Sequence, residues 1–311
     1  MQIIDNLQES AIAEAVVTSG TFDGVHIGHQ KILKRIKDLA KDIGGKSVVV
    51  TFWPHPKFVL GNGWGDLKLL TTFEEKAQLM ADNEIDYLIK IPFTREFSQL
   101  SSSEFVSEII VKKLGTKKLV IGYDHKFGRN REGSFDYLKQ HQEKFGFEIE
   151  EIPRQDVDHV GVSSTQIRSH LLTGNVGDAS KLLGRNFVLS GIVVKGDQVG
   201  RKLGYPTANI YVAEEFKLIP SDGVYVVKVH LDEGSYQGMM NIGLRPTLGG
   251  IRKQIEVNIF DFDRDIYGRR LKIEFIQRLR DERKFNGKEE LVNQLALDKI
   301  ATLEAFRNQA S

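Results

Sequence analysis

The two halves of the chain carry different patterns of apolar residues, and this contrast constrains the fold more than any other feature. In the first half, strand-like segments at 15–18, 47–52, 87–91 and 118–121 alternate with helical patterns that include 29–40 and 101–114. Ser101 with Glu104 three residues later predicts a capping box at the start of the second of these helices. After Leu183, strand-like segments follow one another at 187–194, 223–231, 237–242, 255–261 and 270–277, joined by turns rich in Gly, Pro and Asp. A polar helix is predicted over 288–307 at the end, with Leu291, Leu295 and Leu303 packed against the strands of the second half.

These patterns predict two domains of different class. Alternating strands and helices predict an α/β domain with a Rossmann-like parallel sheet, because each parallel pair of strands needs a crossover connection. Successive strands predict a mostly antiparallel β domain, here followed by a C-terminal helix. The 311 residues also exceed one typical domain of ~100–200 residues. We therefore expect domains at 1–183 and 184–311.

Composition excludes several classes of protein. The net charge is only +1 and lacks a block of like charges, which argues against a broad nucleic-acid-binding face. No apolar run approaches the ~18 residues of a spanning helix, and residues 1–15 lack the features of a signal peptide. The chain has no cysteine, which excludes disulfides and sulfur-ligated zinc. We expect a cytoplasmic protein that binds neither nucleic acid nor membrane; self-association stays compatible with this composition.

The first candidate site is Gly20–His29, between a predicted strand and a predicted helix. Backbone N–H groups and the helix dipole favour an anion there, and the glycines let a phosphate approach the backbone. His26 and His29 are three residues apart, so both can face the same oxygen-rich group. A tight turn would explain the glycines alone, and a zinc pair would need a third ligand beyond Asp23. Phosphate contact is therefore the favoured interpretation.

A second cluster of polar residues, Ser163-Ser164-Thr165, precedes Arg168 by a few positions. Hydroxyls at a helix start can cap the helix or bind phosphate, and an arginine can neutralise a triphosphate. Capping alone explains the serines well, but it does not explain an arginine one turn later.

The second half contains its own phosphate-binding pattern. Gly196, Gly200 and Gly204 recur every four residues beside Lys202, which predicts a loop that folds over phosphates. Thr207 and Asn209 offer two hard oxygens from alternate positions, an arrangement suited to Mg²⁺, although both could instead satisfy backbone groups of a turn.

Glu256 is the candidate general base of the second half. Strand alternation places Glu256 and Asn258 on the face opposite Ile255 and Val257, and a carboxylate is the usual acceptor of a hydroxyl proton. An ordinary solvated strand residue is the alternative.

The segment Gly20-Thr21-Phe22-Asp23-Gly24-Val25-His26-Ile27-Gly28-His29 resembles the nucleotidyltransferase signature of bacterial FAD synthetases. The glycine-rich loop ending in Pro-Thr-Ala-Asn, 206–209, resembles the riboflavin kinase signature. Segments 52–56, 122–128 and 163–168 fit the same resemblance in the same order. Together they cover nearly the whole chain and are similar to bifunctional riboflavin kinase/FAD synthetases.

This resemblance implies an α/β nucleotidyltransferase domain at 1–183 and a riboflavin kinase β-barrel at 184–311. Riboflavin and ATP would give FMN in the second domain; FMN and a second ATP would give FAD and pyrophosphate in the first, with Mg²⁺ as cofactor. Small-molecule substrates are the implied partners. His125 stands where the family pattern leads us to expect an aromatic residue.

The implied site residues fall into four groups. The catalytic residues are His26, His29, Arg168 and Glu256; those that bind ATP or its phosphates are Gly20, Phe22, Asp23, Gly24, Gly28, Ser163, Ser164, Thr165, Gly196, Gly200, Lys202 and Gly204. The flavin-binding residues are His55, Asp124, Phe127 and Arg280, and the metal ligands are Thr207 and Asn209.

Two other functions compete with this one. The first is adenylylation of another phosphate ester, such as a pantetheine or nicotinamide precursor, against which the Pro-Thr-Ala-Asn segment argues. The second is a non-catalytic flavin or nucleotide sensor, which release of ADP and pyrophosphate would distinguish from an enzyme.

Overall fold

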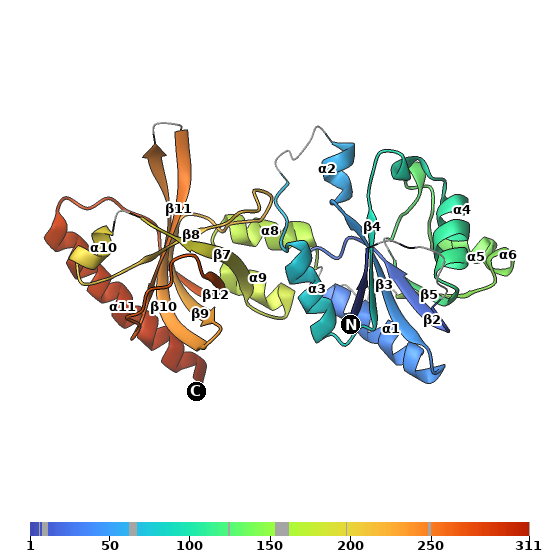
Figure 1. The fold of residues 1–311 in the computed structure, drawn as a ribbon, viewed down its shortest axis with the longest axis horizontal. Coiled ribbons are helices and arrows are strands. Elements are labelled where there is room, and N and C mark those ends of the chain that lie inside the picture. The colour runs from blue at the N-terminus through green and yellow to red at the C-terminus, as the bar shows by residue number, and fades with distance from the viewer. Residues whose placement is uncertain are drawn as a thin grey trace. The chain divides into compact units, whose positions relative to one another are not determined.

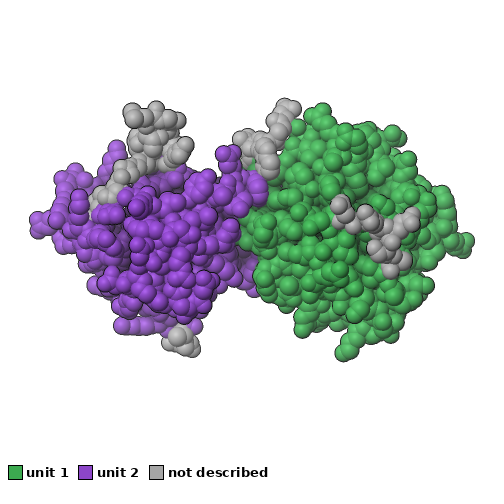
Figure 2. Space-filling view, in the orientation of Figure 1, with its two compact units in different colours: residues 1–164 green, residues 165–311 purple. Residues whose placement is uncertain are grey.

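The computed structural model describes residues 1–5, 7, 12–61, 67–123, 125–152, 162–196, 198–247 and 250–310. The chain forms two compact units, residues 1–164 and 165–311 (Figures 1 and 2). The second unit starts earlier than the predicted second domain because α8 (Ser164–Leu172) and α9 (Val176–Leu183) group with it. The boundary predicted between the two functional domains, at 183/184, stays a prediction.

The first unit is built on a six-stranded parallel sheet in the order β1-β4-β3-β2-β5-β6, which confirms the predicted α/β class. The strand order reverses at β2, whose neighbours are β3 and β5, and ligands of such sheets bind beyond the carboxyl ends at this point. The strands are β1 (Gln2–Ile4), β2 (Ala15–Ser19), β3 (Lys46–Trp53), β4 (Tyr87–Pro92), β5 (Thr116–Gly122) and β6 (Glu148–Ile152).

Apolar residues cover both faces of this sheet, as a parallel sheet requires. Val17 and Val48 belong to a core cluster on one face, and Val16 and Val49 to a second cluster on the other. The helices are α1 (Ile27–Asp42), α2 (Pro56–Leu60), α3 (Phe73–Asp82), η1 (Phe97–Gln99), α4 (Ser102–Glu104), η2 (Phe105–Lys113), η3 (Arg129–Arg131), α5 (Phe135–Gln140) and α6 (Gln142–Phe145).

The helix predicted at 101–114 forms, but only its first turn is an α-helix. Ser101 Oγ accepts a hydrogen bond from the Glu104 N–H (3.2 Å), and the Glu104 carboxylate accepts one from the Ser101 N–H (2.8 Å). This reciprocal capping box is the one that the sequence predicts. The chain then continues as a π-helix, η2, which ends with the Leu114 N–H bonded to the Ile109 carbonyl (3.1 Å).

The second unit is a closed antiparallel barrel in the order β10-β11-β8-β7-β12-β9, which confirms the predicted β class. Its interior is filled by large side chains such as Tyr225 and Phe275, both fully buried. The strands are β7 (Phe187–Val194), β8 (Ala208–Tyr211), β9 (Gly223–Leu231), β10 (Gly234–Thr247), β11 (Gly250–Ile259) and β12 (Arg270–Arg280).

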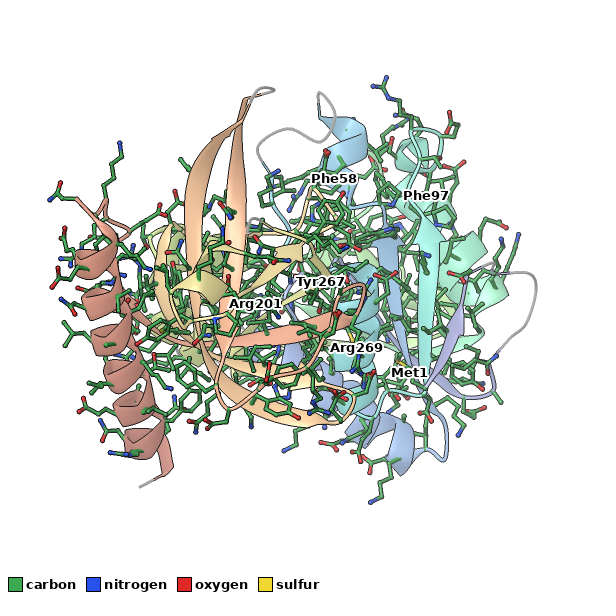
Figure 3. All side chains as sticks on the ribbon, turned by 60° about the vertical axis from the view of Figure 1, so that its left-hand side comes forward. Met1, Phe58, Phe97, Arg201, Tyr267 and Arg269 are labelled. Atoms are coloured by element: carbon green, nitrogen blue, oxygen red, sulfur yellow. The ribbon has the colours of Figure 1, made fainter. Side chains whose placement is uncertain are left out.

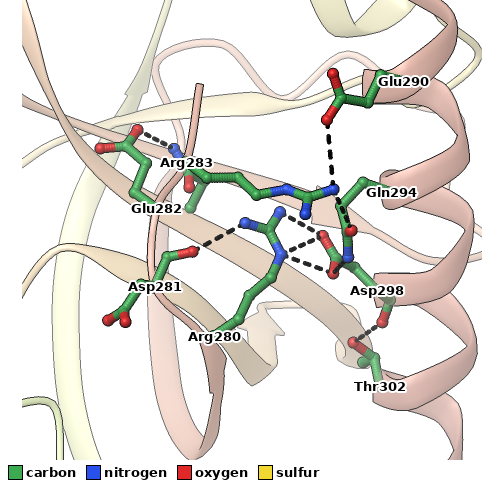
Figure 4. Close-up of polar contacts among 9 residues, drawn as sticks. Arg280, Asp281, Glu282, Arg283, Glu290, Gln294, Asp298 and Thr302 are labelled. Atoms are coloured by element: carbon green, nitrogen blue, oxygen red, sulfur yellow. Dashed lines mark hydrogen bonds and ion pairs between the residues drawn. The ribbon is translucent and has the colours of Figure 1, made fainter. Parts of the chain in front are cut away.

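The C-terminal helix α11 (Lys288–Ala310) packs against β10 and β12 of the barrel. The leucines expected to pack it, at 291, 295 and 303, are only half-buried, whereas Asp298 is 4% exposed and Thr302 is fully buried. The Asp298 carboxylate accepts three hydrogen bonds from Arg280 at the end of β12: Nε donates to Oδ1 (2.9 Å) and Oδ2 (3.2 Å), and Nη2 donates to Oδ2 (2.7 Å) (Figure 4). A buried ion pair therefore anchors the helix.

Candidate active sites

The first candidate site lies where β2 ends and α1 begins, at the reversal point of the parallel sheet. The segment Gly20–His26 makes this connection. Ser19, the last residue of β2, places its Oγ 3.2 Å from His125 Nε2 in the loop after β5. The carboxyl ends of the two strands that flank the reversal point are thus joined, at the edge where ligands bind.

The structure brings His26, His29 and Phe22 together at the start of α1. His26 caps the helix, since its Nδ1 accepts a hydrogen bond from the His29 N–H (3.4 Å). The two imidazole rings stack with centroids 3.6 Å apart, and the Phe22 ring meets His29 edge-on at 5.1 Å. A neutral imidazole that accepts at Nδ1 carries its proton on Nε2, so His26 is prepared to donate to a phosphate oxygen.

The buried Asp23 fixes the conformation of the loop between β2 and α1. Its carboxylate is 3% exposed and accepts hydrogen bonds from the N–H groups of Leu70 (3.0 Å) and Thr71 (3.1 Å). Thr71 Oγ1 in turn accepts a hydrogen bond from the Gly24 N–H (3.2 Å). The loop is therefore fixed to the segment before α3, and the predicted contact of Asp23 with ATP stays a prediction.

The polar cluster at 163–168 coincides with the start of α8, as expected. Ser164 Oγ donates a hydrogen bond to the Asp23 carbonyl (2.9 Å), which connects this cluster to the first loop. Ser163 and Thr165 are exposed, and Arg168 is half-buried. Thr165 and Arg168 belong to the second unit, and the contacts of all four residues with ATP stay predictions.

The residues predicted to bind flavin in this unit have visible local roles. His55 caps α2, because its Nδ1 accepts a hydrogen bond from the Lys57 N–H (3.2 Å). Phe127 packs against Phe105, with ring centroids 5.7 Å apart. Asp124 lies outside the described residues. Flavin contact by all three stays a prediction.

Sequence reasoning missed a row of aromatic side chains near the ends of β3 and β4. We call Phe52, Phe93, Phe97, Phe105 and Phe127 the aromatic row: Phe52 lies 5.9 Å from Phe93, 5.8 Å from Phe97 and 6.2 Å from Phe105, measured between ring centroids. All except Phe105 keep part of their surface exposed. Figure 3 shows Phe97 at the same end of the unit as Phe58 of α2. The aromatic row offers flat apolar surface near the carboxyl ends of β3 and β4.

His125 adds a polar group near this row, with its ring 5.6 Å from that of Phe127. Burial lowers the pKa of His125 to about 4, so the imidazole is neutral at physiological pH. The residue keeps some exposed surface, but its Nδ1 is buried and has no hydrogen-bond partner among the residues that the structure describes.

In the second unit, the structure brings Glu256 and Asn209 together on adjacent strands of the barrel. The two residues are direct partners in the pairing of β11 with β8, so their side chains share a face. Gln254 Nε2 donates to Glu256 Oε1 (2.8 Å) and to Asn209 Oδ1 (3.3 Å). The predicted base and a predicted metal ligand are thus held by one amide.

The neighbouring loop is tightly fitted to this pair. The Asn258 Nδ2 donates a hydrogen bond to the Pro206 carbonyl (2.6 Å), which fixes the backbone next to Thr207. A Cβ at Gly196 would lie 2.2 Å from Asn209 Nδ2, so only glycine leaves room for the carboxamide. The predicted loop contains a one-turn helix, α10 (Val199–Lys202), which includes Gly200 and the exposed Lys202.

Arg280, the fourth residue predicted to bind flavin, is engaged within the protein. Besides its three hydrogen bonds to Asp298, its Nη1 donates to the Asp281 carbonyl (3.0 Å) (Figure 4). Its contact with flavin stays a prediction.

Comparison with known proteins assigns both halves. A family model described as FAD synthetase matches residues 8–166, and one described as riboflavin kinase matches residues 183–306. Bifunctional riboflavin kinase/FMN adenylyltransferases are 36% identical in Escherichia coli K12, over 97% of this chain and 96% of that protein, and 39% identical in Listeria monocytogenes, over 94% and 92%.

A crystal structure described as a macrolide-efflux protein of Streptococcus pneumoniae shares 33% identity and a TM-score of 0.88, covering 97% of this chain and 98% of that one. That likeness is one of sequence and fold and transfers no efflux activity. With both family models matched in order and curated relatives aligned over almost their full length, the chain belongs to the bifunctional riboflavin kinase/FMN adenylyltransferase family.

Proposed function

We propose that this chain makes FMN and FAD: the second unit phosphorylates riboflavin with ATP, and the first unit transfers an adenylyl group from a second ATP to FMN. The observation that carries this proposal is that each family model matches a half of the chain that holds its own candidate site. The models end at 166 and begin at 183, which supports a functional boundary at 183/184.

For adenylyl transfer, a phosphate oxygen of FMN attacks the α-phosphorus of ATP, and pyrophosphate leaves, so no protein nucleophile is needed. The stacked His26 and His29 rings and the N–H groups at the start of α1 would bind the phosphates and stabilise developing charge. Arg168 would add positive charge. Gly20, Gly24 and Gly28 would let the phosphates approach the backbone.

The aromatic row supports a flavin site in the first unit. Isoalloxazine is a flat, mostly apolar ring system, and partly exposed phenylalanines can bury it with offset or edge contacts. Phe127 belongs to this row, and His55 and Asp124 follow in sequence the strands β3 and β5, which flank β2.

For riboflavin phosphorylation, we infer that the Glu256 carboxylate accepts the proton of the primary hydroxyl while the oxygen attacks the γ-phosphorus and ADP leaves. Gln254 orients this carboxylate, as described above. The loop that contains Gly196, Gly200 and Gly204 would cover the phosphates, with Lys202 adding charge.

Thr207 and Asn209 are the proposed Mg²⁺ ligands. Their oxygens are of the hard type that Mg²⁺ prefers, and Mg²⁺ usually completes its coordination with substrate phosphates and water. No group of three or more His, Asp or Glu side chains that could hold a metal occurs in the part of the chain that the structure describes. Bound to Thr207 and Asn209, Mg²⁺ would neutralise phosphate charge.

We propose a cytoplasmic location, because both reactions consume ATP, and small-molecule substrates as the partners. We do not expect the chain to bind nucleic acid or membrane, and self-association stays compatible with this function. No helix among the described residues is long and apolar enough to cross a membrane.

Product analysis of single-residue variants tests the assignment of both sites. Purified protein is incubated with Mg²⁺, ATP and either riboflavin or FMN, under oxidising and reducing conditions, and the flavins are separated by chromatography. Glu256→Gln is expected to lower FMN formation roughly 10²–10⁴-fold while FAD still forms from supplied FMN. His29→Ala is expected to do the reverse, with a loss of about 10²–10³-fold.

The exposed Glu304 on α11 provides a control, and Glu304→Gln is expected to leave both reactions unchanged. Wild-type protein that binds flavin or ATP without releasing ADP or pyrophosphate would favour the sensor. If wild type forms FMN but no FAD, only the function assigned to the first unit is refuted.

A further inference from the structure

Helix α3 buries a lysine in the core of the first unit. Lys76 is 3% exposed and lies on the same helix face as Phe73, Ala77 and Met80, which are also buried. Its ammonium lies 5.5 Å from the centroid of the Trp53 ring. Burying a charge is unfavourable unless partners compensate it, and a methionine of similar length would fit such a place without that cost. A charged residue at this buried position therefore suggests that the charge has a function.

The ammonium is connected to the backbone of the phosphate-binding loop through one hydroxyl. Lys76 Nζ donates a hydrogen bond to Thr51 Oγ1 (3.3 Å), and Thr51 Oγ1 donates one to the Thr21 carbonyl (3.3 Å). A hydroxyl has one proton and two lone pairs, so it can make both bonds at once. Because Thr51 lies on β3, next to β2, this route enters the loop from the neighbouring strand.

A second route reaches the same loop from the same helix. Asp23 accepts hydrogen bonds from the N–H groups of Leu70 and Thr71, just before Thr72, the residue that caps α3. Thr72 is held in a capping box with Glu75. The start of α3 thus fixes the loop at Asp23, and the ammonium fixes it at Thr21.

The charge of Lys76 is sensitive to mildly alkaline pH. Burial lowers the pKa of Lys76 to about 8, and attraction by Asp23 acts in the opposite direction. The Glu75 carboxylate of α3 accepts from the Thr72 N–H. The Lys90 ammonium of β4 lies 4.3 Å from the Phe73 ring and 3.3 Å from Asp5 Oδ1. Lys76 is therefore mostly charged at pH 7 and mostly neutral above pH 9.

We propose that Lys76 is a positioning residue for adenylyl transfer, whose ammonium acts through Thr51 to hold the loop 20–26 in its phosphate-binding conformation. This role rests on the function proposed for the first unit. Lys76 itself is too deeply buried to contact substrate, so it acts through the loop. A neutral amine donates a weaker hydrogen bond than an ammonium, so the support weakens when the proton is lost.

The test compares wild type, Lys76→Met and the control Lys37→Met, which removes a surface lysine paired with Glu84 in the same unit. For each full-length protein, kcat/KM for FAD formation from FMN is measured between pH 7 and 9.5. Riboflavin phosphorylation by the same molecules and the unfolding midpoint of the first unit are measured alongside.

At pH 7, Lys76→Met is expected to lower kcat/KM for adenylyl transfer about ten-fold or more, since a hydrogen bond from a charged group is lost. Its unfolding midpoint should be equal to or above that of wild type, because the buried charge is gone. The ratio of wild-type to variant activity should fall toward one as pH rises past 8. Riboflavin phosphorylation and Lys37→Met should be unchanged.

Three results would overturn the positioning role: equal adenylyl transfer by wild type and Lys76→Met, a ratio that is the same at every pH, or a loss of activity that accompanies a lower unfolding midpoint. Each leaves the proposed function of the first unit standing, since wild type still makes FAD. If wild type makes no FAD from FMN at any pH, the proposed function itself fails, and the positioning role with it.

Discussion

The ion pair between Arg280 and Asp298 makes a quantitative prediction about how the C-terminal helix is held. Asp298→Ala removes a carboxylate that is 4% exposed and leaves the Arg280 guanidinium, whose side chain is 21% exposed, without its charged partner. Removing one member of a buried pair typically costs about 3–5 kcal/mol. Because Arg280 keeps contact with water, we expect the lower end, about 3 kcal/mol. For a unit of this size, that lowers Tm by roughly 10 °C.

Calorimetry and tryptophan fluorescence together can assign this loss to the second unit. Both tryptophans of the chain, at 53 and 64, lie in the first unit. Asp298→Ala should therefore move a calorimetric transition that tryptophan fluorescence does not report. Glu304→Ala, which removes an exposed carboxylate from the same helix, should change stability by less than about 0.5 kcal/mol.

A double-mutant cycle separates the ion pair from other effects of the substitution. Arg280→Ala leaves the buried Asp298 carboxylate without its charged partner and should lower the free energy of unfolding as much as Asp298→Ala does. The double variant should lose much less stability than the sum of the two single variants. If Asp298→Ala behaves like Glu304→Ala, or if the two single losses simply add, the helix is not anchored by this pair.

Three further predictions concern the two candidate sites. The folded-state pKa of His125, about 4 against an ordinary 6.5, means that the unfolded chain binds more protons between these values. The free energy of unfolding of the first unit should thus fall by up to about 3 kcal/mol as pH drops from 6.5 to 4. Unfolding curves of His125→Phe, measured over the same pH range, should not show this fall. If wild type and His125→Phe lose stability in parallel as pH drops, the prediction is wrong. Gly196→Ala, whose Cβ would displace the Asn209 carboxamide, should lower riboflavin phosphorylation in product assays but not adenylyl transfer, while Gly177→Ala, where a Cβ meets nothing within 4 Å, should affect neither. Thr72→Ala, which breaks the capping box of α3, should destabilise the first unit by about 1 kcal/mol in urea unfolding, and an unchanged midpoint would show that the cap contributes nothing.

Local sequence patterns predicted those elements whose stabilising contacts are close in sequence or repeat regularly. Strands β7 and β9 have the predicted bounds because β7 alternates buried and partly exposed residues along its length, and β9 is a run of mostly buried apolar residues. Strand β8 was not predicted from apolar periodicity, because its four residues are too few to show a period, although Thr207 and Asn209 were expected at alternate positions of a strand. The capping box at Ser101 was predicted, but the π-helix after it was not, because the spacing of apolar residues does not distinguish the two hydrogen-bonding patterns.

The contacts that shape both sites were less accessible from sequence because they join residues far apart in the chain. The burial of Asp298 could not be predicted from the spacing of apolar residues, since it depends on Arg280 in another element. Lys76 left one local signal, a charged residue three positions after Phe73 on the buried face of α3, and the Thr72-x-x-Glu75 pattern would have predicted the start of that helix. The histidine pair was predicted because both members lie within one turn of α1.

In both candidate sites, polar side chains fix the backbone of the segment that is proposed to bind phosphate. In the first unit, Asp23 and the Lys76–Thr51 route fix the loop before α1; in the second, Asn258 fixes Pro206, and Gln254 joins Asn209 to Glu256. Phosphoryl and adenylyl transfer need little covalent help from the protein, so their rates depend on how accurately charged groups are placed. Substitutions behind the loops should therefore lower turnover even though they remove no group that contacts a reacting atom.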